Sequence, residues 1–320
     1  MMFGVVGAFI LSRSKFDFWF KHSFKIHIAF TFLLALCFFP SLALQIKGAT
    51  RWIRVGGFTV QPGEFVKYST LFCSVSFFGY FSRWDARERY IRFGILIFPM
   101  LLLMLQPDFG MFFLCAMNII LVSFFSDFPR KWFYSSFLVS LALMGGLLIM
   151  APYRVKRLVS YLDPWNDPMD SGFQVIQSFL AFALGGVWGA GIGNSKEKLF
   201  YLPEAHNDFI FSVIGEELGF AGTLLLISLF FLFLIWGVRL ALGAKGKFKP
   251  VFAIVAIVSI TLQAIINMGV VLGLLPTKGL NLPFISYGGS SLLANALLLG
   301  LFFSVVLQNE SEPPRTTEPA

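Results

Sequence analysis

The segment TLLLISLFFLFLIWGV (residues 223–238) contains no charged residue, and it directly follows YLPEAHNDFIFSVIGEELGFAG (201–222), which carries four carboxylates and a histidine. Together with the apolar residues before it, this run is long enough for a helix of about 20 residues, the length that crosses a bilayer. Charged side chains beside such a helix are costly, so the carboxylates need a functional or structural reason.

Composition extends this interpretation to the whole chain. Of its 320 residues, 57% are hydrophobic and only 13% are charged, and the mean hydropathy is +0.77. A soluble domain would carry about 25% charged residues. We therefore predict an all-α, polytopic helical membrane protein with about eight full spans and a short N-terminal partial span, organised as a single transmembrane domain over 1–307. The partial span covers about 1–12, and the full spans cover about 28–46, 65–82, 93–106, 109–126, 132–151, 209–240, 251–273 and 286–307.

The distribution of positive charge predicts the orientation. Fifteen of the 25 Lys and Arg residues fall in one set of connecting segments and ten in the alternate set. The richer set should be cytoplasmic, which makes 308–320 a disordered cytoplasmic tail. The net charge of +8 is thus explained by membrane topology, and we expect no nucleic-acid partner. The outer basic residues suit an anionic lipid headgroup or a phosphate, although they could also be ordinary surface charges.

One extracytoplasmic loop, about 152–208, is much longer than the others. Its stretch FQVIQSFLAFALGGVWGAGIGNS (173–195) is apolar but interrupted by five glycines, which favours a re-entrant or interfacial helix over a full span. The loop ends at Asp208, just before the helix that we expect from 209. Asp208 could be a helix cap, or an ionised carboxylate that acts as a general base.

Further acids and polar segments fall on the same predicted side. Glu216 lies about two turns beyond Asp208, and with Glu217 it is either a site residue or a hydrogen-bonded structural one. Glu64 and Lys67 are spaced for an ion pair at a helix start, and Asp108 is placed to cap another helix. We expect one outer cavity to collect these groups with the turn-rich segment 275–291. The three cysteines are expected to be small buried hydrophobic residues, and the three histidines have no metal-ligand spacing, so no metal site is predicted.

Several of these stretches together resemble a known family. They are GATRWI, QPGEFVK, LQPDFG, DPWNDPMDSGFQVIQS, YLPEAHNDFIFSVIGEELG and LPTKGLNLPFISYGGSS, in the family's order from about 47 to 307. They resemble the SEDS family (shape, elongation, division and sporulation), which includes FtsW, RodA and SpoVE, and the wording is nearer to the FtsW branch. Against the family's ten spans, the first is missing here and the second is short. A misassigned start, a truncation or a natural nine-helix form would each account for this.

The resemblance implies a peptidoglycan glycosyltransferase of the bacterial cytoplasmic membrane that polymerises lipid II during cell division. Asp208 would be the catalytic base, and extracytoplasmic Lys and Arg side chains would bind the lipid pyrophosphate. A divalent cation, Mg²⁺ or Mn²⁺, could assist. The implied partners are lipid II, the nascent glycan strand, a class B penicillin-binding protein, other division proteins and membrane lipid. The residues implied to bind substrate or to support the site are Arg51, Glu64, Lys67, Asp108, Gln177, Lys198, Glu204, His206, Glu216 and Lys278.

Two other functions remain open from the sequence. A lipid II flippase would need a polar path through the full depth of the membrane, whereas the polar residues here concentrate at one predicted end. A non-catalytic scaffold of the division machinery would not need Asp208 or the outer basic residues.

Overall fold

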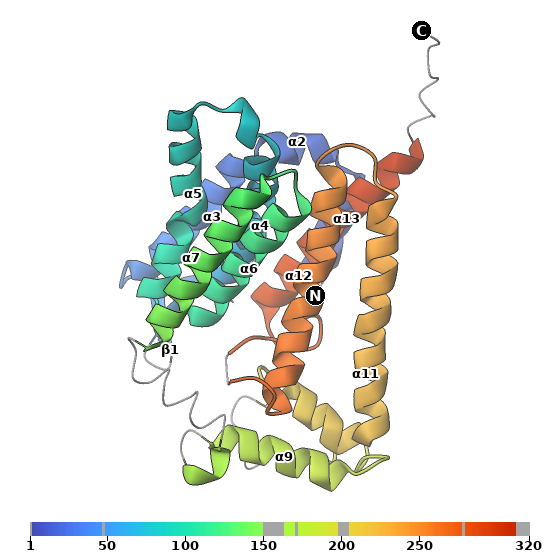
Figure 1. Cartoon of the computed structure of the whole chain (residues 1–320). Helices are drawn as coiled ribbons and strands as arrows, with labels where there is room; N and C mark the ends of the chain where they lie inside the picture. Colours follow the sequence, from blue (N-terminus) through green and yellow to red (C-terminus); the bar gives the residue numbers. More distant parts are fainter. Residues whose placement is uncertain are drawn as a thin grey trace. The chain divides into compact units, whose positions relative to one another are not determined.

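The computed structural model describes residues 2–46, 49–149, 163–169, 172–197, 205–276 and 279–311. The chain forms two compact units. Unit 1 comprises 1–129, 235–259 and 289–320, and unit 2 comprises 130–234 and 260–288, so that two of the four boundaries fall within long helices. The helices are α1 (Met2–Arg13), α2 (Phe16–Lys21), α3 (Ser23–Ala35), α4 (Pro62–Gly79), α5 (Ala86–Leu105), α6 (Phe109–Phe125), α7 (Arg130–Ile149), α9 (Phe173–Gly185), α11 (Ile210–Leu242), α12 (Lys249–Val271) and α13 (Gly289–Ser311) (Figure 1).

Unit 1 is a helical bundle in which α1 packs on α13, and α4 packs on α3 and α6. Glycines permit the close approach of α1 and α13, because a Cβ atom at Gly300 would lie 2.6 Å from the carbonyl oxygen of Ala8. The end of α1 is held from α13, where Ser304 and Gln308 both donate to the Ser14 carbonyl. Aromatic rings fill the space around Phe72, with Phe16 and Phe252 in direct ring contact.

Unit 1 also contains a small antiparallel sheet that the sequence analysis did not predict. Its strands are β1 (Ala43–Ile46), β2 (Ala49–Val55) and β3 (Phe58–Val60), in that order across the sheet. The β2–β3 connection is the pair Gly56–Gly57, and Gly56 has a φ of +60°, as a tight hairpin turn requires. The predicted span 28–46 is therefore wrong in its second half: α3 ends at Ala35, a short 3-10 turn follows, and the chain then turns into β1. Pro40, just before the strand, cannot continue a helix.

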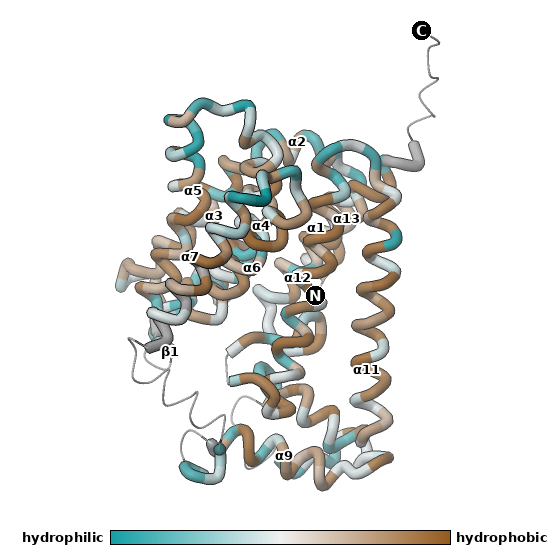
Figure 2. Tube along the Cα trace, in the orientation of Figure 1, coloured by the Kyte–Doolittle hydropathy of each residue, from teal (hydrophilic) through white to brown (hydrophobic). Residues whose placement is uncertain are grey.

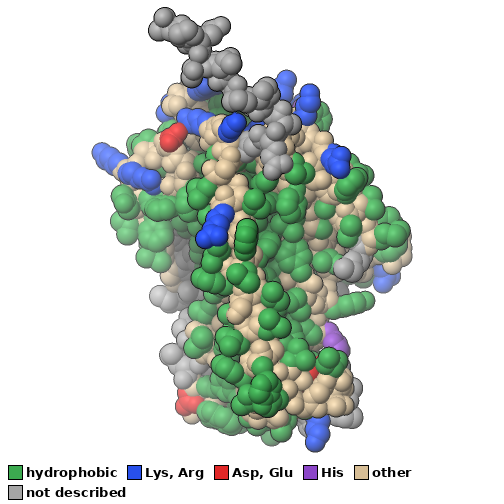
Figure 3. All heavy atoms as spheres, turned by 90° about the vertical axis from the view of Figure 1, so that its right-hand side faces the viewer, with side chains coloured by type: hydrophobic (Ala, Val, Ile, Leu, Met, Phe, Trp, Pro, Cys, Tyr) green, Lys and Arg blue, Asp and Glu red, His purple; other side chains and the backbone are tan. Residues whose placement is uncertain are grey.

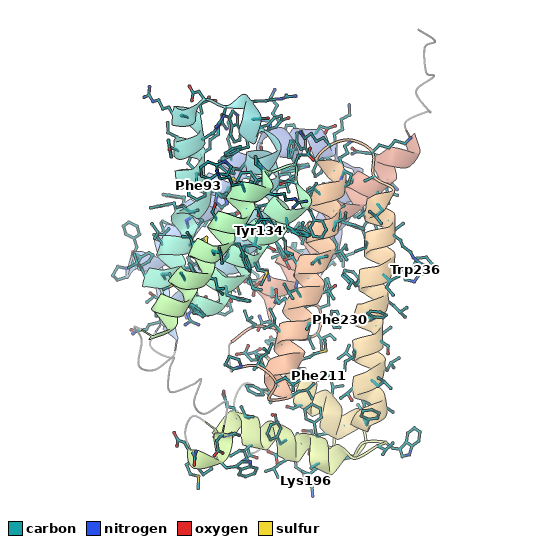
Figure 4. The ribbon with its side chains drawn as sticks, viewed as in Figure 1. Phe93, Tyr134, Lys196, Phe211, Phe230 and Trp236 are labelled. Atoms are coloured by element: carbon teal, nitrogen blue, oxygen red, sulfur yellow. The ribbon has the colours of Figure 1, made fainter. Side chains whose placement is uncertain are left out.

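Unit 2 has its core around the N-terminal part of α11. Ala205, Phe209, Phe211 and Phe230 pack there with Met268 of α12. Phe211 and Phe230, labelled in Figure 4, both come from α11, and the Phe182 ring of α9 contacts Phe211 edge-on. The helix α9 confirms that the predicted re-entrant or interfacial segment begins as a helix, although it ends at Gly185 and an irregular glycine-rich segment follows.

Within the described residues, three helices are long and apolar enough to cross a membrane: 210–242, 249–271 and 289–308. Four shorter apolar helices accompany them. Hydrophobic residues run along most of α11 (Figure 2), and Figure 3 shows hydrophobic side chains over most of the face that carries this helix. Leu225, Phe231 and Trp236 are among the exposed ones, as expected for contact with lipid. The predicted start of the tail at 308 is early by four residues, since α13 continues to Ser311.

Candidate active site

Asp208 lies in a turn, 205–209, that leads into α11. Ala205 and Phe209 at the two ends of this turn are buried in the core of unit 2. Between these two anchors, His206 is exposed, and Asn207 and Asp208 are half-buried. The two apolar residues anchor the turn in the core, and the three polar residues between them stay at its surface. The Asp208 carboxylate is thereby held at the edge of the apolar core.

Each backbone carbonyl of the polar centre accepts a hydrogen bond from another part of unit 2. The Tyr287 N–H donates to the His206 carbonyl over 2.9 Å, and the Ser286 hydroxyl donates to the Asn207 carbonyl over 2.7 Å. The Asn267 side chain, on α12, donates to the Asp208 carbonyl over 2.8 Å. The Asp208 carboxylate lies close to Gly279, where a Cβ atom would be 3.1 Å from Oδ2. The turn is thus held by α12 and by the segment 279–287.

Glu216 is buried on α11 and serves as an acceptor for the segment that follows α9. Its Oε2 accepts from the Ser195 hydroxyl over 2.5 Å, and its Oε1 accepts from the Lys196 backbone N–H over 2.8 Å. The Lys196 side chain itself is exposed (Figure 4). Of the two alternatives stated for Glu216, these contacts support the hydrogen-bonded structural one.

Glu197 is a second carboxylate beside Glu216 that the sequence analysis did not single out. Its side chain is only 6% exposed, and its Oε2 is buried without a hydrogen-bond donor in the described part of the chain. Burial raises the pKa of Glu197, and the negative charge of Glu216 raises that pKa further.

In unit 1, Glu64 and Lys67 form the predicted ion pair on the first turns of α4. The Lys67 Nζ lies 2.6 Å from the Glu64 Oε2, and both side chains are fully buried. The ammonium also lies 4.6 Å from the ring centre of Tyr68, whose hydroxyl donates to the Asn295 side chain on α13. A buried pair of this kind needs such surrounding contacts, because removing two charges from water is costly.

Arg51 and Asp108 also meet in unit 1. The strand β2 carries Arg51, whose guanidinium donates to the Pro107 carbonyl over 2.6 Å and lies 3.9 Å from the Asp108 carboxylate. Asp108 caps α6 as predicted, accepting from the Met111 N–H over 3.2 Å. Burial raises the pKa of Asp108, while the positive charge of Arg51 opposes that shift.

The remaining predicted site residues are less defined. Gln177 lies half-buried on α9. Lys198, Glu204 and Lys278 lie outside the described residues. The convergence of the groups of both units on one outer cavity stays a prediction. Among the described residues, no group of three or more His, Cys, Asp or Glu side chains is arranged to hold a metal ion. The three cysteines are free and buried, which confirms their predicted role.

Sequence reasoning missed Asn267, Ser286 and Gln263. Gln263 lies one helical turn before Asn267 on α12, and its side chain donates to the Asn281 carbonyl over 2.8 Å. Two amide side chains spaced i,i+4 in an otherwise apolar helix mark a face that must find polar partners. That spacing was the signal available in the sequence.

Comparison with known proteins gives consistent matches over nearly the whole chain. A family model described as "Cell cycle protein", for FtsW, RodA and SpoVE, matches residues 1–311. The "Probable peptidoglycan glycosyltransferase FtsW" of Trichlorobacter lovleyi is 38% identical over 309 residues, which covers 94% of this chain and 80% of the relative. The stage V sporulation protein E of Bacillus subtilis is 38% identical over 305 residues, covering 94% of this chain and 83% of the relative.

Solved structures agree with these relatives. A chain from a study described as "Structural coordination of polymerization and crosslinking by a peptidoglycan synthase complex" has a TM-score of 0.77 and 32% identity, and the match covers 97% of this chain and 88% of the other. The rod shape determining protein RodA of Thermus thermophilus has a TM-score of 0.67 and 28% identity, covering 96% of this chain and 85% of the other. An aspartate-to-alanine mutant of that protein matches with a TM-score of 0.68.

Proposed function

The chain belongs to the FtsW/RodA/SpoVE family of cell cycle proteins, and from that premise we propose that it is a peptidoglycan glycosyltransferase in which Asp208 is the general base. The observation that carries this proposal is the anchored turn 205–209, which holds a half-buried carboxylate at the start of an apolar helix. A general base must be held within hydrogen-bond reach of the proton it removes, and a fixed turn meets that need better than a mobile loop.

The proposed reaction polymerises lipid II. The Asp208 carboxylate accepts the proton of the acceptor sugar's hydroxyl, and the resulting oxygen attacks the anomeric carbon of the donor chain. The bond from that carbon to the lipid pyrophosphate breaks, with inversion, and undecaprenyl pyrophosphate leaves. Negative charge develops on the leaving pyrophosphate, and basic side chains stabilise it there. We assign this role to Arg51, Lys198 and Lys278, with His206, Gln177 and Glu204 as supporting residues.

A divalent cation could share the work on the pyrophosphate. Mg²⁺ is commonly held by one or two carboxylates together with substrate phosphates, so it needs no closed set of protein ligands. A bound ion would supply Lewis-acid stabilisation of the phosphate oxygens. The proposed proton transfer to Asp208 does not depend on the ion.

We also propose a partner. The structural relative described as a peptidoglycan synthase complex supports an assembly with a transpeptidase, and we expect a class B penicillin-binding protein together with other division proteins. The membrane helices and the family support a multi-pass protein of the bacterial cytoplasmic membrane. From the distribution of positive charge we propose that the site lies at the outer face and the C-terminus inside.

The test is polymerisation of purified lipid II by the full chain with its cognate transpeptidase in detergent. We expect long glycan strands from the wild type and none from Asp208→Asn, which keeps the size of the side chain and removes the base. The matched control is Asp127→Asn, because Asp127 is an exposed aspartate in unit 1 that pairs with Lys247. Its activity should equal that of the wild type.

Four results would contradict the proposal. Strands from folded Asp208→Asn would exclude the base role. If Asp208→Ala lowered the free energy of unfolding by more than about 2 kcal/mol, a structural cap would explain the residue. If no variant made strands while lipid II crossed vesicle membranes, the chain would be a flippase, and if neither occurred it would be a scaffold.

A further inference from the structure

Building on the proposed role of Asp208, we propose that Asn267 and Ser286 are positioning residues that fix the catalytic carboxylate relative to the segment 279–287. Neither residue need touch substrate. Each acts through the backbone of the turn that carries Asp208.

Asn267 is the central contact. The residue is 1% exposed, and its Nδ2 donates both to the Asp208 carbonyl, over 2.8 Å, and to the Leu280 carbonyl, over 2.6 Å. A side-chain amide nitrogen carries two hydrogens, so both are used. The buried Asn267 side chain therefore sets the separation between Asp208 and Leu280. Leu280 lies two positions after Lys278, the residue to which we assign pyrophosphate binding.

Ser286 makes an independent second contact. Its hydroxyl donates to the Asn207 carbonyl over 2.7 Å and accepts from the Leu282 N–H over 2.7 Å, so it links the turn to the same segment. With the bond from the Tyr287 N–H to the His206 carbonyl, three consecutive carbonyls, 206–208, are held from outside the turn. A turn whose role was only to begin α11 would not need all three, because solvent can satisfy carbonyls that are this close to the surface.

Position matters here because the carboxylate must reach a hydroxyl of a bound sugar. Gly279 passes so close to the Asp208 carboxylate that the two backbone segments must keep their spacing. A misplacement of about 1 Å between reacting groups can cost about 100-fold in rate. We call the contacts of Asn267 and Ser286 with the turn the clamp. Loss of the clamp should therefore lower kcat, while lipid II binding, which uses other groups, stays intact.

The experiment compares Asn267→Leu and Ser286→Ala with Ser178→Ala. Leucine has nearly the shape of asparagine but cannot donate. The control removes a buried hydroxyl of unit 2 that donates to the Val271 carbonyl at the end of α12, remote in sequence from the turn. For each full-length variant we would measure kcat and KM for lipid II, and amide hydrogen exchange in a peptide covering 205–212.

We expect kcat to fall about 10- to 100-fold in both clamp variants with KM within about twofold of the wild type, and exchange in 205–212 to accelerate. Ser178→Ala should match the wild type in both readouts. The inference is overturned if the clamp variants keep the control's kcat, if KM alone changes, or if exchange is unaltered.

Two further results remain decisive. If the wild type makes no strands, the proposed function fails, and the exchange readout alone decides whether the clamp exists. If Asn267→Leu does not fold, Ser286→Ala carries the test.

Discussion

At the scale of single residues, the buried ion pair of α4 is the costliest feature of unit 1. Glu64 and Lys67 are both inaccessible to solvent, and the Glu64 Oε1 is buried without a hydrogen-bond donor in the described part of the chain. Each charge is tolerable only because the other is 2.6 Å away. The pair is therefore a coupled unit, and its members should not be replaceable one at a time.

Replacing one member should cost more than replacing both. We expect Lys67→Met to lower the free energy of unfolding by about 3–5 kcal/mol, because it leaves the Glu64 carboxylate buried and unpaired. The double variant Glu64→Gln, Lys67→Met should recover much of that loss, since no uncompensated charge remains. Denaturation of the detergent-solubilised protein, followed by tryptophan fluorescence, would measure both.

The matched control is the exposed pair of Glu88 and Arg92, whose charged atoms are 3.9 Å apart. Glu88→Gln should change stability by less than about 1 kcal/mol. If Lys67→Met proved as mild as that control, the pair would not be a structural unit, and a substrate role alone would have to explain the two residues.

The residues of the site were only partly predictable. Glu64, Lys67 and Asp108 could be placed because their partners lie within three residues in the chain. Asn267 and Ser286 could not, because their partners are 59 and 79 residues away and only the folded chain brings them together. Glu216 could be recognised as a buried acid, but the sequence did not show which loop would donate hydrogen bonds to it.

At the scale of elements, α11 contains a bend at Gly219, where the backbone is not helical. The backbone hydrogen bonds that the helix loses there are replaced by bonds to another segment. In an uninterrupted helix, the N–H groups of 220 and 221 would donate to the carbonyls of 216 and 217. Here those N–H groups donate to Gly186 and Val187, and those carbonyls accept from Ala190 and Gly191. The glycine-rich segment after α9 thus supplies new acceptors for the two N–H groups and new donors for the two carbonyls. Backbone next to a bilayer must have all its polar groups paired in this way. Figure 1 shows α9 ending beside the bend.

Gly219 is the residue on which this exchange depends. Its φ is +67°, and a Cβ atom there would lie 2.4 Å from the Gly189 nitrogen and 2.5 Å from the Val187 oxygen. We expect Gly219→Ala to destabilise the protein by at least about 2 kcal/mol, from the left-handed conformation and the overlap together. The same denaturation measurement applies.

Gly94→Ala is the control for Gly219→Ala, because Gly94 lies in helix α5 with open space around it. That change should be neutral or stabilising by up to about 1 kcal/mol. Equal effects at the two positions would show that the bend is not a fixed feature of the fold.

Long apolar runs made most elements predictable: α6, α7, α11 and α12 begin and end within two residues of the predicted spans. The error at 28–46 has a specific cause. The residues of β1, ALQI, are too few to distinguish helix from strand by periodicity, and only their pairing with β2 decides. The helix α5 begins seven residues before the predicted span because its first turns are charged and are capped by Asp85, so hydropathy alone does not detect them.

At the scale of the whole molecule, the orientation in the membrane is the property that links the site to its substrate. If the chain polymerises lipid II at the outer face, as proposed, the segment after α9 must face outward. From the distribution of positive charge we expect the β2–β3 hairpin to face outward as well. The segment 80–92, which contains the α4–α5 connection and the first turns of α5, should then face the cytoplasm, in keeping with its four arginines. The β2–β3 hairpin and the α4–α5 connection lie at opposite ends of α4. The 18 residues of this helix span about 27 Å, close to the thickness of the hydrocarbon core.

Cysteine labelling tests this orientation with little background, because the native Cys37, Cys73 and Cys115 are buried. We expect a membrane-impermeant maleimide to label Thr59→Cys, in β3, and Asn194→Cys, after α9, in intact spheroplasts, since both positions are exposed. Arg87→Cys, exposed in the first turn of α5, should be labelled only after the membrane is disrupted. The reverse pattern would place the Asp208 turn on the cytoplasmic side, away from the growing wall, and would rule out polymerisation there. Labelling of Thr59→Cys and Arg87→Cys from the same side would show instead that α4 does not cross the membrane.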